Sequence, residues 1–191
     1  MLVTRYRIWT PLVLLACLAV VGCGDENDES NDEINSEGCC ADAYCFVPAG
    51  DDIMATCVNP VYERGGGMIY LDAGEYRLTD PVHLYADNLI LQGQGASTLL
   101  KVDDDARIAA IVIGSLDAEP TGDHVENVVV RDLAINGNMA NQSGESWLAP
   151  YDYLNANGVT VRRGRNVVLE NLLIESCRSG GVVTEKGTEK L

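Results

Sequence analysis

The chain has 191 residues, enough for one ordinary domain with extensions. Lys and Arg number 13 against 29 Asp and Glu, and the formal charge of −16 excludes a nucleic-acid binder that neutralises phosphates with a basic face. Glycine is frequent, at 19 residues, and only 6% of residues are aromatic, so the composition also argues against a coiled coil or a helical bundle.

Residues 1–22 have the pattern of a targeting segment. Two arginines precede an almost wholly apolar run over 9–21, which is short for a membrane span. The run ends in Val-Val-Gly-Cys, which resembles the lipobox of bacterial lipoproteins. The resemblance implies cleavage before Cys23, acylation of its thiol and, because the next residue is not Asp, a place in the outer membrane of the cell envelope. An ordinary signal peptide with an incidental cysteine is the alternative.

The next segment, residues 23–37, is strongly acidic. It holds seven acidic side chains, no basic ones and a single large apolar residue, Ile34. Such a segment buries too little apolar surface to fold, and its like charges keep it extended. We expect a disordered tether that lifts the following domain off the membrane.

Four of the seven cysteines fall within 19 residues: Cys39, Cys40, Cys45 and Cys57. In an oxidising compartment they predict two disulfides, in any of three pairings. A zinc site is the alternative, although the paired C-x2-C spacing and a nearby histidine are both missing. We expect residues 38–60 to form a small Cys-rich segment that covers the N-terminal end of a domain over 61–191.

Beyond the Cys-rich segment, short apolar bursts are separated by Gly, Asn and Asp, and no helical period persists. Residues 127–138 (NVVVRDLAINGN) align with 166–177 (NVVLENLLIESC) at an offset of 39, and a weaker copy begins a further 39 residues upstream at Asn88. A shorter offset of 23 relates 157–161 to 180–184. One period holds three short strands, which predicts one coil of a parallel solenoid.

Strand alternation predicts which side chains fill the coils. The predicted inward set is Val159, Val161, Val167, Leu169, Leu172 and Ile174. The predicted outward set is Thr160, Val168, Glu170, Leu173 and Glu175. The matched asparagines suit amide ladders that satisfy backbone groups at the turns. A leucine-rich repeat is disfavoured because its Leu-x-x-Leu-x-Leu spacing is absent, and a β-sandwich predicts no such period.

Two stretches resemble a known superfamily. Residues 65–76 (GGGMIYLDAGEY) are similar to the opening coil of the pectin-lyase-like superfamily, with Asp72 in place of the usual proline. Residues 88–95 and 132–142 resemble later coils. The resemblance implies an all-β fold, a right-handed parallel β-helix, and a polysaccharide partner. It implies no single reaction, because this scaffold hosts lyases, hydrolases, epimerases and non-enzymes.

Characterised members of that superfamily have more coils than this chain can form. No amphipathic helix follows the last predicted strand, 181–184, and an uncapped solenoid exposes strand edges and core. We therefore expect a truncated β-helix whose C-terminal edge is covered by further coils or by a partner.

The loop over 139–156 interrupts the period and concentrates Trp147, Tyr151 and Tyr153. Such rings beside a sheet suit stacking on sugar faces, or else they pin the loop to the coils. Asn157 follows the loop. The junction around it resembles one in polygalacturonases, which carry a catalytic Asp at the position of Asn157. Because an amide is neither acid nor base, hydrolysis of that type is disfavoured. No catalytic residue can be named.

Arginines cluster in the last third of the chain: Arg162, Arg163, Arg165 and Arg178. They could neutralise a uronate carboxylate, as elimination by a lyase requires, or they could be exposed and solubilising. Arg178, just before a strand, is best placed to touch an acidic sugar. The run 103–105 is three aspartates that could bind Ca²⁺, but it lacks the alternating spacing of a Ca²⁺ loop, so we expect a solvated turn and no cofactor.

The sequence thus predicts a surface-anchored lipoprotein with a β-helix that binds or processes polysaccharide. The predicted chemistry is of the lyase or epimerase type rather than hydrolysis. The predicted substrate-binding residues are Trp147, Tyr151, Tyr153, Asn157 and Arg178. The alternatives are a non-catalytic surface module for binding or structure, and an inactive fragment of a longer enzyme.

Overall fold

The computed structural model describes residues 40–41, 44–144 and 151–191. The predicted signal segment, the acidic tether, Cys39 and Trp147 therefore lie outside the described residues. The elements are β1 (Cys40–Ala41), β2 (Tyr44–Val47), η1 (Met54–Val58), α1 (Asn59–Glu63), β3 (Gly67–Leu71), β4 (Gly74–Leu78), β5 (Val82–Leu84), β6 (Leu89–Val102), β7 (Ile111–Gly114), β8 (Val125–Glu126), β9 (Val129–Asn136), η2 (Met139–Asn141), β10 (Val159–Arg162), β11 (Gly164–Arg165), β12 (Val168–Glu175) and β13 (Val182–Glu185).

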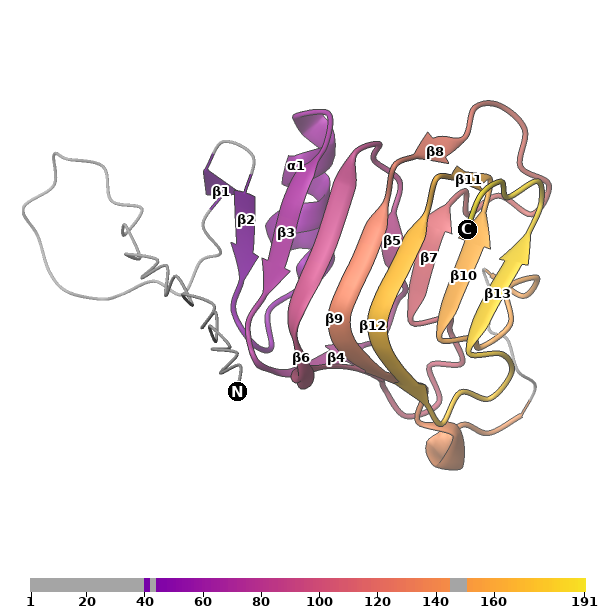
Figure 1. Cartoon of the computed structure of the whole chain (residues 1–191). Coiled ribbons are helices and arrows are strands. Elements are labelled where there is room, and N and C mark those ends of the chain that lie inside the picture. The colour runs from indigo at the N-terminus through magenta and orange to yellow at the C-terminus, as the bar shows by residue number, and fades with distance from the viewer. Residues whose placement is uncertain (1–39, 42–43, 145–150) are drawn as a thin grey trace, which may run out of the picture. The chain divides into compact units, whose positions relative to one another are not determined.

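The strands stack in three sheets. One sheet has the order β1-β2-β3-β6-β9-β12, with β4 also paired to β6, a second has the order β13-β10-β7-β5, and a third pairs β11 with β8. Among the described strands, every pairing except that of β1 with β2 is parallel. Figure 1 shows these strands side by side along the stack of coils. The predicted parallel β-helix is confirmed.

Both sequence offsets are the registers of neighbouring strands. Val168 of β12 pairs with Val129 of β9, which is the offset of 39. Val182 of β13 pairs with Val159 of β10, which is the offset of 23. The bursts expected as two separate strands over 166–175 form one strand, β12, which bends where Asn171 has a positive φ. The repeat therefore predicts which residues pair between coils, but it does not predict where one strand ends and the next begins.

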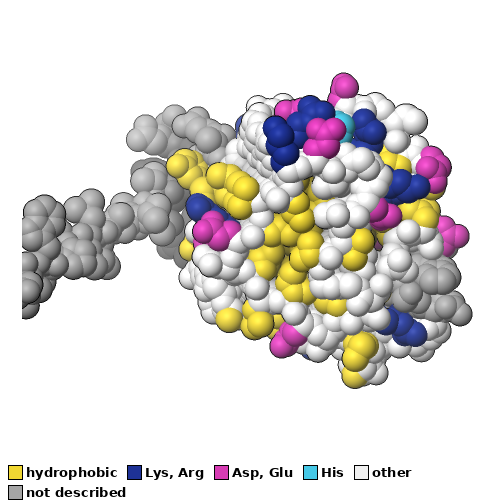
Figure 2. Space-filling model, turned by 45° about the vertical axis from the view of Figure 1, so that its right-hand side comes forward, with side chains coloured by type: hydrophobic (Ala, Val, Ile, Leu, Met, Phe, Trp, Pro, Cys, Tyr) yellow, Lys and Arg dark blue, Asp and Glu magenta, His cyan; other side chains and the backbone are white. Residues whose placement is uncertain are grey.

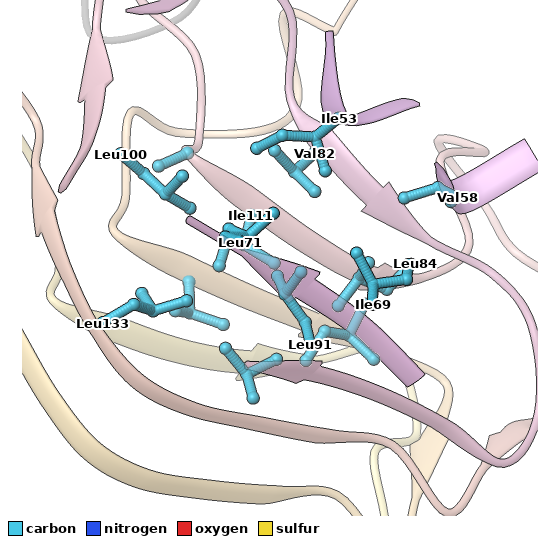
Figure 3. Packing of buried hydrophobic residues seen from close by; sticks show 14 of the residues in the cluster. Ile53, Val58, Ile69, Leu71, Val82, Leu84, Leu91, Leu100, Ile111 and Leu133 are labelled. Atoms are coloured by element: carbon cyan, nitrogen blue, oxygen red, sulfur yellow. The ribbon is translucent and has the colours of Figure 1, made fainter. Parts of the chain in front are cut away.

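The coil interior is a continuous column of aliphatic side chains, seen from close by in Figure 3. Of the predicted inward residues, Val159, Val161 and Val167 are buried. The other three, on β12, are only partly buried against the same cluster: Leu169, Leu172 and Ile174. They belong to the last coil described. Figure 2 turns this end of the stack forward and shows hydrophobic side chains in its middle.

The Cys-rich segment contributes to the same core. Cys45 on β2 forms a disulfide with Cys57 in η1, and both are buried in the aliphatic column. β2 also pairs in parallel with β3, so this segment stacks directly on the first coil. One of the two predicted disulfides is thereby described. No described helix is long and apolar enough to cross a membrane.

The predicted amide ladder is present. Asn88, Asn127 and Asn166 share a positive φ. Asn127 Nδ2 donates to Asn88 Oδ1 at 2.9 Å, and Asn166 Nδ2 donates to Asn127 Oδ1 at 3.2 Å. A second rung joins Asn171 Nδ2 to Asp132 Oδ1 at 3.0 Å. Asn and Asp tolerate the left-handed conformation better than other residues with a Cβ, so the turns use them to reverse direction and to bond between coils.

Candidate functional site

The outer face of the β5-β7-β10-β13 sheet is covered by the loop that interrupts the repeat. Leu154, flanked by Tyr151 and Tyr153, packs on Val112 of β7. The expectation that Thr160 faces solvent is wrong, since its side chain is fully buried although it points away from the core. Strand alternation predicted correctly which way the Thr160 side chain points, but the loop that covers this face excludes solvent from it.

The two described aromatic rings of the loop are held against the coils. The Tyr153 hydroxyl donates to the carbonyl of Leu116, and the Arg162 guanidinium lies 5.1 Å from the centre of the Tyr153 ring. Burial raises the pKa of Tyr153, although the nearby Arg162 charge opposes the shift. A cation over a ring face is a favourable contact. These contacts fit the alternative role left open by the sequence, in which the rings pin the loop.

Arg162 organises the neighbouring loop. Its side chain is 1% exposed. Nη1 donates to the carbonyls of Ser115 and Asp117, at 3.2 Å and 2.6 Å, and Nη2 donates to that of Ala118 at 3.0 Å. Nε lies 3.3 Å from Glu185 Oε1 but without the geometry of a hydrogen bond. The fork of the guanidinium suits several acceptors at once, and its burial keeps it out of reach of a ligand.

The Asn157 side chain is buried and hydrogen-bonded to neighbouring parts of the chain. It is 2% exposed, its Oδ1 accepts from the Gly180 amide at 2.8 Å, and its Nδ2 donates to Thr160 Oγ1 at 3.0 Å. The amide therefore ties two consecutive coils together at this turn. An amide suits this position, because an ionised Asp could not donate to the Thr160 hydroxyl oxygen.

Arg178 lies beside the same turn, where the Ser179 amide donates to the Ala156 carbonyl at 3.1 Å. Its guanidinium donates to the carbonyls of Gln142 and Gly144, at the start of the 139–156 loop. Arg178 is only partly buried. The structure thus brings Arg178 and Asn157 to one turn and places the tyrosines on the adjoining sheet face.

The remaining arginines of the cluster also hold loops. Arg163 donates to the Gly122 carbonyl. Arg165 pairs with Glu126 and Glu189, at 2.6 Å and 2.9 Å, and thereby lowers the pKa of the Glu189 carboxyl. Sequence reasoning treated the cluster as either solubilising or sugar-binding and missed this third role. No local pattern in the sequence signals this role, since the loops that these arginines hold come from distant positions in the chain.

The three consecutive aspartates are hydrogen-bonded to other segments, Asp103 to β4 and the next two to Asn138 and Ser143 around the start of the 139–156 loop. Asp103 Oδ1 accepts from Arg77 at 2.8 Å and Asp104 Oδ1 from Asn138 at 2.8 Å. Asp105 Oδ1 accepts from both the amide and the hydroxyl of Ser143, which lowers the Asp105 pKa. Within the described part of the chain, no three His, Cys, Asp or Glu side chains are grouped as metal ligands.

These features define a parallel β-helix with loops fixed over one outer sheet face. No family model matches the chain. In sequence it is 32% identical over 105 residues to mannuronan C5-epimerase AlgE4 of Azotobacter vinelandii, a match that covers 49% of this chain and 18% of that protein. It is 31% identical over 103 residues to alginate lyase 7 of the same organism, covering 49% of this chain and 11% of that protein.

A solved structure is similar as well. The A-module of mannuronan C-5 epimerase AlgE6 of Azotobacter vinelandii superposes with a TM-score of 0.53 at 26% identity, covering 73% of this chain and 38% of that chain. The chain is therefore homologous to mannuronan epimerase and alginate lyase modules of the parallel β-helix type. It spans less than a fifth of the length of the two curated relatives.

Proposed function

We propose that this chain is a polyuronate-processing β-helix, of the lyase or epimerase type, held at the bacterial cell envelope by lipid on Cys23. The observation that carries the proposal is the joint likeness, in sequence and in structure, to mannuronan epimerase and alginate lyase modules. The absence of a hydrolase-like carboxyl at Asn157 is consistent with this direction.

Both reaction types begin with the same step. A base removes the proton from the carbon beside the uronate carboxylate, and a cation or hydrogen-bond donor stabilises the charge that develops on that carboxylate. A lyase then expels the oxygen of the glycosidic bond, which leaves an unsaturated sugar. An epimerase returns a proton to the opposite face of the same carbon. Loss of this proton is shared by the two reactions, but only the epimerase returns a solvent proton to the same carbon.

The turn around Arg178 is the part of the predicted site that fits a substrate contact. Arg178 is partly exposed and carries guanidinium N–H groups beyond the two carbonyl contacts. Tyr151, also partly exposed, lies on the adjoining sheet face, and Trp147 belongs to the same loop in sequence. We propose that a sugar chain runs across this loop, with Arg178 against a carboxylate. Tyr153 and Asn157 then act by shaping the loop and the turn.

The experiment is an incubation of the full chain with polymannuronate in heavy water. Deuterium at C5 of the recovered polymer together with inverted sugar residues supports an epimerase, and ultraviolet absorbance from unsaturated ends supports a lyase. Arg178→Ala should reduce polymer binding, whereas Arg77→Ala, at an exposed arginine outside this turn, should not. Binding with neither C5 deuterium nor unsaturated ends would replace catalysis by the non-catalytic surface module. Absence of binding to any uronate polymer would overturn the proposal.

Lipid anchoring has a separate test. Expression in a Gram-negative host with radiolabelled palmitate should label the chain and place it in the membrane fraction. Cys23→Ser should lose the label and appear in the soluble fraction of the envelope. A labelled Cys23→Ser chain would assign the lipid elsewhere.

A further inference from the structure

A hollow of about 410 Å³ lies at the turns between coils, and none of the described residues of the 139–156 loop lines it. This volume falls in the range of small-molecule sites. Its walls come from α1, from the turn between β5 and β6, and from the segment that leads into β8, elements that Figure 1 shows at the same end of the coils. The lining residues are Tyr62, Gly65, Tyr85, Ala86, Asp87, Asn88, Asp123, His124 and Val125.

One wall is a fixed aromatic surface. The Tyr62 and Tyr85 ring centres are 4.4 Å apart with planes inclined at 45°, and Tyr85 also lies 4.9 Å from the His83 ring. The Tyr85 hydroxyl donates to Asn59 Oδ1 at 2.8 Å, which holds the ring in place. Tyr62 is 50% exposed. The hollow therefore presents a large ring that is supported from behind and open to solvent.

The rim offers hydrogen-bond acceptors. Asp87 Oδ1 accepts from the Glu126 amide at 2.8 Å, which leaves Oδ2 for another donor. Asp123 is exposed and has no hydrogen-bond partner among the described residues. His124 is oriented between the Gly187 carbonyl, 2.9 Å from Nε2, and Arg165 Nη2, 3.1 Å from Nδ1. Because arginine can only donate, Nδ1 is the acceptor in the contact with Arg165.

We propose that this hollow binds one uncharged sugar ring, at a site separate from the polyuronate surface. The polarised C–H groups of a sugar face would lie on Tyr62, which offers an aromatic surface with a polar end. Sugar hydroxyls would donate to the free oxygens of Asp87 and Asp123, and hydrogen bonds to ionised acceptors are the stronger kind. A uronate would place a third carboxylate beside these two, which like-charge repulsion disfavours.

The test titrates the full chain with methyl glycosides of mannose, glucose and galactose and with mannuronate oligomers, using ligand-observed NMR. At least one neutral glycoside should bind, Tyr62→Ala should weaken its binding by about tenfold, and Tyr62→Phe should retain most of it. Asp123→Asn should weaken it less. Tyr44→Ala, at a more exposed tyrosine on β2, is the matched control and should have no effect.

Absence of neutral-sugar binding, equal binding by Tyr62→Ala, or equally tight mannuronate binding that depends on Tyr62 would each overturn the proposal. The outcome is independent of the proposed function, since polymannuronate turnover, measured as C5 deuterium or as unsaturated ends, should be the same in the Tyr62→Ala chain as in the parent. Absence of both signals in the parent chain, with intact neutral-sugar binding, would instead reject catalysis on polyuronate alone.

Discussion

Arg162 shows how a single residue links sequence, packing and the candidate site. It sits on a strand at an outward position, where an arginine would ordinarily be solvated. The loops on both sides cover it, and its fork satisfies three carbonyls that have no strand partner. These hydrogen bonds fix the loop that holds the three carbonyls to the coils.

Loss of this fork should be costly. Arg162→Met keeps much of the volume but leaves three carbonyls without their donor and Glu185 without its ion-pair partner, so the free energy of unfolding should fall by about 3 kcal/mol. Arg77→Ala removes an exposed arginine that contacts Glu75 and Asp103, and should cost less than about 1 kcal/mol. Urea denaturation measures both. Equal losses in the two variants would contradict a structural role for Arg162.

The buried Tyr76 hydroxyl should make the stability of the fold decrease at high pH. This hydroxyl donates to the carbonyls of Val47 and Asp72, and burial together with the Asp72 charge raises its pKa from 10.0 to about 12. Below pH 10 both folded and unfolded chains keep the proton, so its stabilisation is complete. As the pH rises from 10 towards 12 the unfolded chain loses the proton first, and stability falls.

Tyr76→Phe should therefore be less stable than the parent at neutral pH, by about 1 kcal/mol for the lost hydrogen bonds. The difference between the two proteins should shrink above pH 10, because only the parent loses stability through this group. Denaturant titrations of both across that interval measure it. A constant difference would show that the Tyr76 hydroxyl does not keep its proton in the folded chain.

At the scale of elements, the turns determine how one coil stacks on the next. The ladder of Asn88, Asn127 and Asn166 combines two separable contributions, a left-handed backbone and a side-chain bond between coils. Glycine keeps the first and removes the second, whereas alanine loses both. The central asparagine has a ladder partner on each side, so it is the position where the two contributions can be resolved.

Asn127→Gly should lower the free energy of unfolding by about 1 kcal/mol, for two lost ladder bonds, and Asn127→Ala by about 2 kcal/mol, because it adds the strain of a positive φ. The order of the two variants is the prediction. Thermal or urea unfolding measures it, and an alanine variant as stable as the glycine variant would show that the turn relaxes out of the left-handed region.

The same elements show what the sequence can predict. The repeat offsets predicted the pairing of Val168 with Val129 and of Val182 with Val159, because stacked strands need matching side chains at fixed intervals. The burial of Thr160 and the role of Arg162 were beyond reach. Both depend on loops that fold back across the sheet from distant positions, and no local period encodes such contacts. The Tyr62 hollow was missed for the same reason, since its walls come from three separate segments.

At the scale of the whole molecule, the charge of −16 bears on both proposed ligands. A polyuronate is itself an anion, so long-range repulsion opposes its approach to this chain even where a local arginine attracts one carboxylate. Seven of the acids lie in residues 23–37, apart from the β-helix in sequence. A neutral sugar has no such long-range interaction.

The association rate with polymannuronate should therefore rise as NaCl increases from about 0.01 M to about 0.1 M, because the screening length shortens from about 30 Å to about 10 Å. Replacing the seven acids of 23–37 by their amides changes the formal charge from −16 to −9 and should make this rise shallower. Neutral-sugar binding should not change with salt in either chain. Stopped-flow measurements with a labelled polymer give the rates. A rate that falls with salt, as for a basic protein on a polyanion, would show that the arginines near Arg178 dominate the encounter and that the net charge does not.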